Sequence, residues 1–226
     1  MEQLFNGFSL DIPAGVFPLS TDSMILAHFA RLPKNAKVLD LGSGCGTLGV
    51  LLCAKDAACH VTGIEISQEA HLAATQNICR NGLQDRMESI CTDLRQFIAN
   101  SNFDCCVSNP PYFTGGAASK RSPTARRDDT CPTEALFAAA AKALKFGGDF
   151  FLVHKPEKLA TLMAQAVGAG LEPKRLLTVY HHPGSDISLI LLACRKGAKP
   201  GLVWEKLYLF EEGGQPTPEY KTIYHL

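Results

Sequence analysis

The sequence predicts an open α/β fold, in which a mainly parallel sheet is flanked by helices. Three observations predict it. Residues 37–41 form an apolar run of strand length that leads directly into a glycine-rich loop and an apolar helix. A second such run, residues 60–65, ends in a carboxylate, and a third, residues 104–108, ends at two consecutive prolines. Open α/β sheets hold their ligands at such strand ends.

Length and composition fit one domain of this kind. The chain has 226 residues, of which 46% are hydrophobic and 19% charged. We expect a single domain over residues 1–226: an N-terminal cap segment (1–33), a core (34–195), and a C-terminal strand and tail (196–226). No apolar run approaches the roughly 18 residues of a membrane span, and no secretion signal is recognisable at the N-terminus. A soluble cytoplasmic protein without a membrane partner is expected.

Cysteine and histidine usage argues against a metal site. The nine cysteines include no CxxC pair and no histidine at ligand spacing, so we interpret them as small buried hydrophobes in a reducing compartment. The adjacent His181 and His182 invite a metal interpretation, but a solvated turn is the simpler one. The formal net charge is zero, so a nucleic-acid partner would have to bind a local basic patch.

Glycine and proline interrupt the short apolar stretches of the N-terminal segment. Residues 5–19 predict an irregular or hairpin lead-in. The residues that follow, Ser20, Thr21 and Asp22, predict the N-cap of an apolar helix that ends before Pro33. Capping this helix is the simple interpretation of Thr21 and Asp22.

The glycine loop spans Gly42, Ser43, Gly44, Cys45 and Gly46, between the first strand and a helix over residues 47–54. Glycines allow close backbone approach, and the helix N-terminus offers free N–H groups. The second strand ends at Glu65, where nucleotide-binding folds place an acid for the ribose hydroxyls. Thr47 occupies the position of the third glycine in a dinucleotide fingerprint, which disfavours NAD. The pattern favours a mononucleoside-sized cofactor, with a plain βα turn as the alternative.

A third strand is predicted over residues 87–91, after a helix that Ser67 caps and Gly82 ends. Asp93 lies just past this strand. Its carboxylate could accept a hydrogen bond from an adenine amino group, although an ordinary loop aspartate is the alternative. We expect residues 94–99 to form a short helix.

The corner formed by Asn109, Pro110, Pro111 and Tyr112 follows the strand at residues 104–108. Two prolines fix φ and remove two N–H donors, so the corner is stiff. The Asn109 side-chain oxygen and the Pro110 carbonyl offer two acceptors for a planar amino group, and Tyr112 offers a stacking face. The alternative is a strand-to-loop turn without chemistry.

The C-terminal half continues the alternation of helices and strands. A helix from Pro132 to Lys145 would end at the glycine pair at 147–148. Further elements are expected as strand 149–154, helix 156–168, strands 176–180 and 187–194, and an edge strand over 203–210 followed by an ordered or partly ordered tail.

The segment after the corner carries a charge cluster. It contains Lys120, Arg121, Arg126 and Arg127, opposed by the acidic pair at 128–129. Phosphate contact and a solvated, disordered loop are both compatible with this pattern. If the segment binds RNA, the target base must leave its stack to reach Asn109, which favours a base in an exposed loop.

Together, these motifs resemble the class I S-adenosylmethionine-dependent methyltransferases that modify amino groups. The shared array is Val-Leu-Asp40-Leu-Gly-Ser-Gly-Cys-Gly46, Gly-Ile-Glu65-Ile66, Thr-Asp93-Leu94 and Asn-Pro-Pro-Tyr112. The resemblance implies a doubly wound, Rossmann-like, seven-stranded sheet. It also implies that the methionine part lies at Asp40, Gly42, Ser43, Gly44 and Gly46, the ribose at Glu65 and Ile66, the adenine at Asp93 and Leu94, and the target nitrogen at Asn109, Pro110, Pro111 and Tyr112.

Narrower features resemble the bacterial enzymes that methylate N6 of adenosine 37 in a valine tRNA. These are Ser-Thr21-Asp22 before an apolar helix, Ala125-Arg-Arg-Asp128, and Val-His-Lys-Pro-Glu157. Those enzymes often have Ala-Arg-His-Glu where this chain has Ala-Arg-Arg-Asp. The resemblance implies S-adenosylmethionine as cofactor, S-adenosylhomocysteine as product, a tRNA anticodon loop as substrate, and a place for Thr21 and Asp22 in the cofactor site.

Direct in-line methyl transfer, without a metal, is the mechanism that this resemblance implies. Three alternatives stay open: methylation of a protein glutamine amide, methylation of ribosomal RNA or DNA, and a cofactor-binding interaction module without catalysis. An intact Asn109–Tyr112 corner argues against the last, because a non-catalytic module does not need it.

Overall fold

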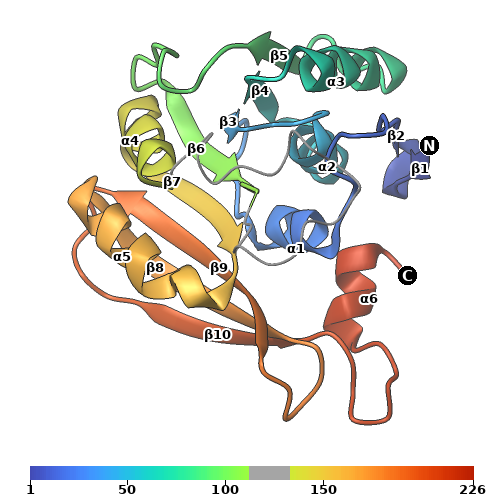
Figure 1. Ribbon diagram of the computed structural model, residues 1–226, viewed down its shortest axis with the longest axis vertical. Helices are drawn as coiled ribbons and strands as arrows, with labels where there is room; N and C mark the ends of the chain where they lie inside the picture. The colour runs from blue at the N-terminus through green and yellow to red at the C-terminus, as the bar shows by residue number, and fades with distance from the viewer. Residues whose placement is uncertain (112–132) are drawn as a thin grey trace.

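In a computed structural model that describes residues 1–111 and 133–226, one mostly parallel sheet lies between two layers of helices (Figure 1). The doubly wound α/β fold expected from the sequence is confirmed. In chain order, the elements are β1 (Glu2–Gln3), η1 (Phe5–Gly7), β2 (Ser9–Leu10), α1 (Thr21–Phe29), β3 (Lys37–Leu41), α2 (Thr47–Lys55), β4 (His60–Glu65), α3 (Gln68–Arg80), β5 (Met87–Cys91), β6 (Phe103–Ser108), α4 (Thr133–Ala143), β7 (Leu144–His154), η2 (Pro156–Lys158), α5 (Leu159–Gly168), β8 (Leu171–Tyr180), β9 (Ile187–Lys196), β10 (Val203–Tyr208) and α6 (Pro218–Tyr224).

The main sheet has the strand order β10-β8-β9-β7-β6-β3-β4-β5. The strands from β5 to β7 are parallel to their neighbours, β9 is antiparallel to both β7 and β8, and β10 is parallel to β8. The seven strands from β5 to β8 make up the sheet that the family resemblance implies. The eighth, β10, is the edge strand predicted near the C-terminus.

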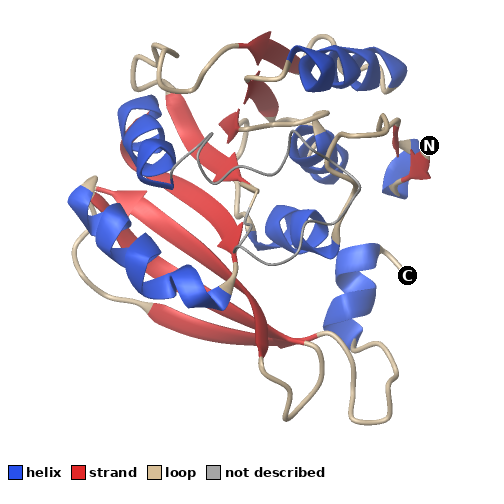
Figure 2. Cartoon of the chain, viewed as in Figure 1, coloured by secondary structure: helices blue, strands red, loops and turns tan. Residues whose placement is uncertain are grey.

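Apolar residues cover both faces of the sheet, as expected for strands buried between helices. Val38 and Phe151 point into a cluster with α1, α2, α3 and α6, whereas Leu39 and Phe150 point into a cluster with α4 and α5. This alternation follows the two-residue period of a strand. Figure 2 shows the resulting layers of helix and strand.

One predicted helix is absent, and another ends earlier than predicted. The helix predicted over residues 94–99 is absent: residues 94–96 form a turn, in which the N–H groups of Gln96 and Phe97 donate to the Asp93 carbonyl, and residues 97–99 are irregular. The helix expected to reach Lys145 ends at Ala143, and β7 begins directly after it. The glycines at 147–148 lie inside β7, where a Cβ on Gly148 would come within 2.9 Å of the Asp104 carbonyl oxygen. Gly148 allows close strand contact where the register between β6 and β7 shifts, between the pairs Phe103–Leu144 and Cys105–Asp149.

One strand is longer than predicted, and one helix was not predicted. β8 begins at Leu171, earlier than predicted, because a register shift accommodates Pro173, which lacks an N–H donor. The tail forms α6, which the sequence analysis did not assign. Its start signal is an N-cap threonine, Thr217, followed by a proline at the first helical position; the Thr217 hydroxyl accepts a hydrogen bond from the Tyr220 N–H at 3.1 Å.

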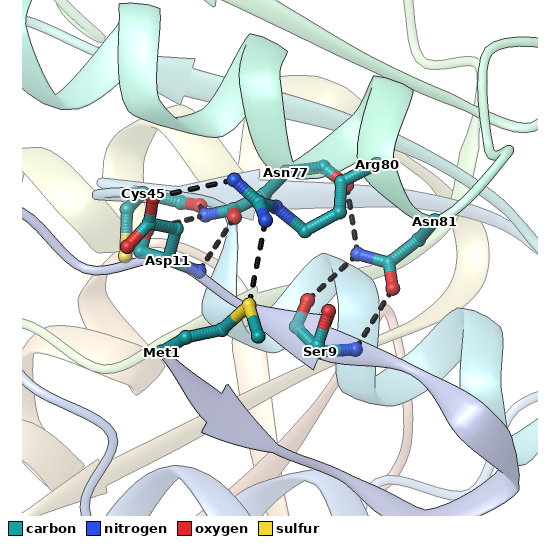
Figure 3. A network of polar contacts seen from close by, with 7 residues as sticks. All are labelled: Met1, Ser9, Asp11, Cys45, Asn77, Arg80 and Asn81. Carbon is teal, nitrogen blue, oxygen red and sulfur yellow. Dashed lines mark hydrogen bonds and ion pairs between the residues drawn. The ribbon is translucent and has the colours of Figure 1, made fainter.

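Residues 2–10 form a hairpin, in which β1 and β2 pair antiparallel, and residues 11–19 are irregular, so the lead-in predicted over 5–19 combines both predicted forms. A buried asparagine of α3 fastens the segment after the hairpin (Figure 3). Asn77 accepts from the Asp11 N–H at 2.8 Å and donates to the carbonyl oxygens of Asp11 and Cys45, both at 3.0 Å. One side chain therefore joins the N-terminal segment to the glycine loop.

Most of the described cysteines are buried, as expected for small hydrophobes; Cys79 and Cys91 are exposed. His181 and His182 lie in the predicted exposed turn between β8 and β9. In residues 1–111 and 133–226, no helix has the length and apolar character needed to cross a bilayer.

Candidate functional site

The candidate site lies where the order of the sheet reverses. β3 and β6 are neighbours, but the chain continues from β3 outward to β4 and from β6 outward to β7. The crevice at such a switch point is where open α/β sheets bind ligands. The register pairs Asp40 with Val107, so the glycine loop after β3 and Asn109 after β6 emerge side by side. The Ser108 hydroxyl donates to the Leu41 carbonyl at 2.7 Å and fixes the two strand ends together.

The glycine loop is held by the neighbouring strand β4. The N–H groups of Gly42 and Ser43 both donate to the Ile64 carbonyl at 2.9 Å. Gly42, Gly44 and Gly46 have φ values of 74°, 56° and 83°, which residues with a Cβ rarely adopt. A Cβ on Gly42 or Gly44 would meet no atom within 4 Å, so backbone conformation, and not lack of space, requires glycine there. The loop borders open space at the positive end of α2.

Glu65 connects this loop to the next helix. One carboxylate oxygen accepts from the Gly44 N–H at 2.9 Å and the other from the Ser67 N–H at 2.8 Å. A carboxylate has lone pairs for further donors, so ribose hydroxyls can also bind. The next residue, Ile66, is 59% exposed and offers an apolar surface beside the carboxylate.

Asp40 carries a fully buried carboxyl group, and neither oxygen has a hydrogen-bond partner in the described part of the chain. Burial, with the nearby charge of Glu65, raises its pKa to about 7; the Gly49 N–H opposes this rise without reaching hydrogen-bond geometry. The buried Ser43 hydroxyl likewise has no partner among the described residues. Buried polar groups without partners are rare, and these fit a ligand with a cationic, hydrogen-bonding group.

Asp93 lies just past the end of β5, close to Glu65, whose carbonyl accepts from the Thr92 N–H at 2.9 Å. Both Asp93 oxygens accept hydrogen bonds from Arg95, at 2.9 and 3.0 Å from Nε, with a further contact to a terminal nitrogen. These bonds lower the Asp93 pKa. Leu94 packs into the cluster on the α4 and α5 side. The predicted adenine contacts are therefore near the crevice, but one is paired and the other partly buried.

The corner after β6 has a fixed side-chain orientation. Asn109 Nδ2 donates to the Ser23 hydroxyl at 2.9 Å, while the buried Oδ1 makes no hydrogen bond to any described residue. The free acceptor is the atom that the sequence analysis assigned to an amino group. Pro110 is buried and Pro111 partly buried. Tyr112, Lys120, Arg121, Arg126 and Arg127 lie outside the described residues, and their roles stay predictions.

Ser23 was not predicted as a site residue, whereas the two preceding residues of α1 were. The structure places Ser23, only 3% exposed, against the corner. A hydroxyl on the buried side of an apolar helix was the available signal. Thr21 accepts from the Tyr224 hydroxyl at 2.9 Å. Asp22 is partly buried, which raises its pKa, against the opposing effect of the charge of Lys155 beyond β7.

Comparison with known proteins yields a family match and named relatives. Residues 14–171 match the family model described as "Methyltransferase small domain". A Bacteroides fragilis protein named "tRNA1(Val) (adenine(37)-N6)-methyltransferase" is 31% identical over 181 residues, covering 77% of this chain and 76% of the relative. A Shewanella halifaxensis protein with the same name is 32% identical over 165 residues, covering 71% and 67%.

Solved structures share the fold. A predicted O-methyltransferase from Agrobacterium tumefaciens superposes with a TM-score of 0.77 at 22% identity, covering 91% of this chain and 96% of that chain. A 16S rRNA methyltransferase from T. thermophilus, in complex with AdoMet and guanosine, superposes with a TM-score of 0.62 at 25% identity, covering 87% and 49%.

Proposed function

The chain belongs to the methyltransferase small domain family, and on that premise we propose that it methylates N6 of an adenosine in tRNA with S-adenosylmethionine. Adenosine 37 in the anticodon loop of a valine tRNA is the proposed target, and the cytoplasm the proposed compartment. The observation that carries the proposal is the buried Asn109 oxygen, which has no hydrogen-bond partner among residues 1–111 and 133–226, beside a glycine loop at the switch point of the sheet.

The residues of the crevice fit the cofactor. Asp40 and Ser43 present buried polar atoms without partners in the described chain, and an α-ammonium group could bind there. Gly42, Gly44 and Gly46 would lie along the methionine part, Glu65 and Ile66 against the ribose, and Asp93 and Leu94 near the adenine. When bound, S-adenosylmethionine supplies a methyl group activated by a sulfonium.

The corner would aim the substrate nitrogen. Asn109 Oδ1 and the Pro110 carbonyl would accept the two hydrogens of the amino group, which directs the nitrogen lone pair out of the purine plane. Ser23 would keep the amide in the orientation that presents oxygen. No general base is required beforehand: as the methyl group passes to the nitrogen, S-adenosylhomocysteine would leave, and the positively charged nitrogen would then release one proton to solvent. Orientation, and acceptors that favour the developing ammonium, would supply much of the catalysis.

The identity of the substrate is proposed from the relatives' names together with this corner. An adenine amino group is planar and carries two hydrogens, as the pair of acceptors requires. To reach Asn109 the base must leave its stack, which costs least in a loop. Tyr112 would then stack on the base, and Lys120, Arg121, Arg126 and Arg127 would contact phosphates.

Mass spectrometry tests the function directly. Purified protein is incubated with unmodified valine tRNA and isotope-labelled S-adenosylmethionine, and the tRNA is digested to nucleosides. We expect labelled N6-methyladenosine, which disappears when the target adenosine is replaced by guanosine. Label in another nucleoside would overturn the assignment to adenosine. Label only in added protein would favour glutamine methylation, and absence of label from every acceptor, with retained cofactor binding, would favour a non-catalytic module.

A further inference from the structure

We propose that a cavity between the N-terminal segment, α1 and α6 is a subsite for a nucleobase that neighbours the methylated adenosine in the RNA strand. The inference rests on the proposed function. The cavity has a volume of about 590 Å³, within the range of small-ligand sites. None of its described lining residues comes from the glycine loop or the Asn109 corner. They are Gln3, Leu4, Phe5, Leu19, Ser20, Thr21, Met24, Tyr220, Tyr224 and His225.

Aromatic rings make up much of this lining. Phe5 and His225 stack with ring centroids 3.7 Å apart, and Tyr220 and Tyr224 stack at 4.3 Å, with interplanar angles of 27° and 20°. All four side chains line the cavity and none is fully buried. Aromatic rings that remain partly exposed are the usual platform on which proteins stack single-stranded bases. The ligand indicated is therefore flat.

The polar groups of the lining narrow the chemistry further. Gln3 and Ser20, with the paired hydroxyls of Thr21 and Tyr224, provide donors and acceptors. The described lining contains no aspartate, glutamate, lysine or arginine. A phosphate would need cationic partners, whereas a base needs ring faces and neutral hydrogen-bonding groups. These properties favour a base over the sugar-phosphate backbone.

The position of the cavity fits a neighbouring nucleotide. Ser20 lines the cavity, and its hydroxyl lies 3.4 Å from the Ser23 hydroxyl, which in turn binds the Asn109 amide. The cavity and the corner thus lie on two sides of the first turn of α1, which rises by about 5 Å. A strand that delivers one base to Asn109 has its next base within reach of the cavity once the bases are unstacked.

This subsite assigns a role to both ends of the described chain. Figure 1 shows the N- and C-termini on the same side of the molecule, with α6 next to α1. The Tyr224–Thr21 hydrogen bond fastens α6 to the start of α1, and the Tyr220 ring also packs against Phe210. The C-terminal helix would then complete an RNA-binding surface and not merely cover the core.

Two ring deletions and one modified RNA form the test. Tyr220→Leu keeps apolar bulk, and His225→Ala removes an exposed ring near the chain end, so at least the second leaves folding intact. Tyr208→Leu is the matched control, because the Tyr208 ring packs against Tyr180 but does not line the cavity. The substrates are unmodified tRNA and the same tRNA with an abasic nucleotide on one or the other side of the target adenosine.

We expect Tyr220→Leu and His225→Ala to lower kcat/KM for intact tRNA about fivefold to a hundredfold through KM. The cofactor affinity of both variants should equal that of the wild type, and so should kcat/KM of the Tyr208→Leu control. With one of the two abasic tRNAs, kcat/KM of the wild type should fall by a similar factor. The same abasic tRNA should cause no additional fall in the variants. Equal losses with the control would overturn the subsite, and a selective loss of cofactor affinity would reassign the cavity to the cofactor's adenine. Absence of methylation of any RNA by the wild type would instead refute the proposed function.

Discussion

The two sides of the crevice each contain a buried polar side chain, Asp40 on one side and Asn109 on the other, and hold it differently. On the β3 side, Asp40 is buried without a hydrogen-bond partner among the described residues, and its pKa rises to about 7. On the β6 side, the Asn109 amide is neutral and is oriented by Ser23, a residue 86 positions away in the chain. We propose that the first arrangement, which destabilises the free protein, serves to bind a cationic group of the cofactor, and that the second orients an acceptor for the substrate amine. Binding and chemistry should therefore respond to different substitutions.

Among the substitutions on the β3 side, Gly44→Val is expected to lower cofactor affinity most. A β-branched residue cannot adopt φ of 56° without strain, and the displaced N–H would leave Glu65. We expect cofactor affinity to fall roughly a hundredfold, since both backbone strain and a charge-assisted hydrogen bond are affected. Calorimetric titration with S-adenosylmethionine measures it. Gly82→Val is the control, because Gly82 also has a positive φ, 63°, but ends α3 away from the crevice; equal losses in both variants would contradict the role of the loop.

Asp40→Asn should weaken cofactor binding about tenfold while stabilising the free protein. In the folded state the Asp40 pKa is raised from 3.8 to about 7. The native state therefore binds this proton more tightly, and wild-type stability falls as pH rises from about 4 to 7. The stabilisation by asparagine should be large at pH 8, on the order of 1 kcal/mol or more, and small near pH 4. Thermal denaturation at both pH values checks this, and a gain independent of pH would contradict it.

Ser23→Ala should slow methyl transfer about tenfold and leave cofactor affinity unchanged, since it removes the hydrogen bond that orients the Asn109 amide. In an Asn109→Ala background the same change should have almost no further effect, because Ser23 acts through that amide. Single-turnover rates of the four proteins measure this coupling. Ser188→Ala is a suitable control, because the Ser188 hydroxyl also makes one hydrogen bond, to the Val179 carbonyl, but at a partly buried position away from the corner. Additive effects would reduce Ser23 to a structural residue.

The smallest effect concerns pH. If a cationic group of the cofactor pairs with ionised Asp40, wild-type affinity should increase by no more than about tenfold between pH 6 and pH 8 and level off above the pKa of about 7. Asp40→Asn should abolish this dependence. Titration calorimetry across that range would reveal it, and an equal slope in both proteins would assign the titration to another group.

The sequence predicted the cofactor side of the crevice better than the substrate side. Strands 37–41, 60–65 and 87–91 were predicted with their observed bounds, because each is a short run flanked by polar or turn-forming residues. The glycine loop is local in the chain, and so is its link to Glu65. The Ser23–Asn109 contact joins distant segments and has no local pattern. That Asp40 has no hydrogen-bond partner in the described part of the chain depends on packing from several elements.

In the C-terminal half, too, features that depend on tertiary packing could not be predicted from the sequence. Glycines at 147–148 were interpreted as a helix stop, but they lie inside β7. Glycine is needed at 148 because the neighbouring backbone leaves no room for a Cβ there. The helix α6 could have been predicted from Thr217 and Pro218, which together are a typical start signal. Its packing against α1 and the cavity between them are tertiary features.

Asn109→Ala tests the central claim most directly, when cofactor affinity and the single-turnover rate of tRNA methylation are measured on the same preparation. The substitution removes the aimed acceptor but leaves the glycine loop, Asp40 and Glu65 in place. The account predicts a rate loss of about a hundredfold or more with cofactor affinity within a few-fold of wild type. A wild-type rate, or an equal loss of rate and cofactor affinity, would contradict the division of the crevice into one side that binds the cofactor and another that orients the substrate nitrogen.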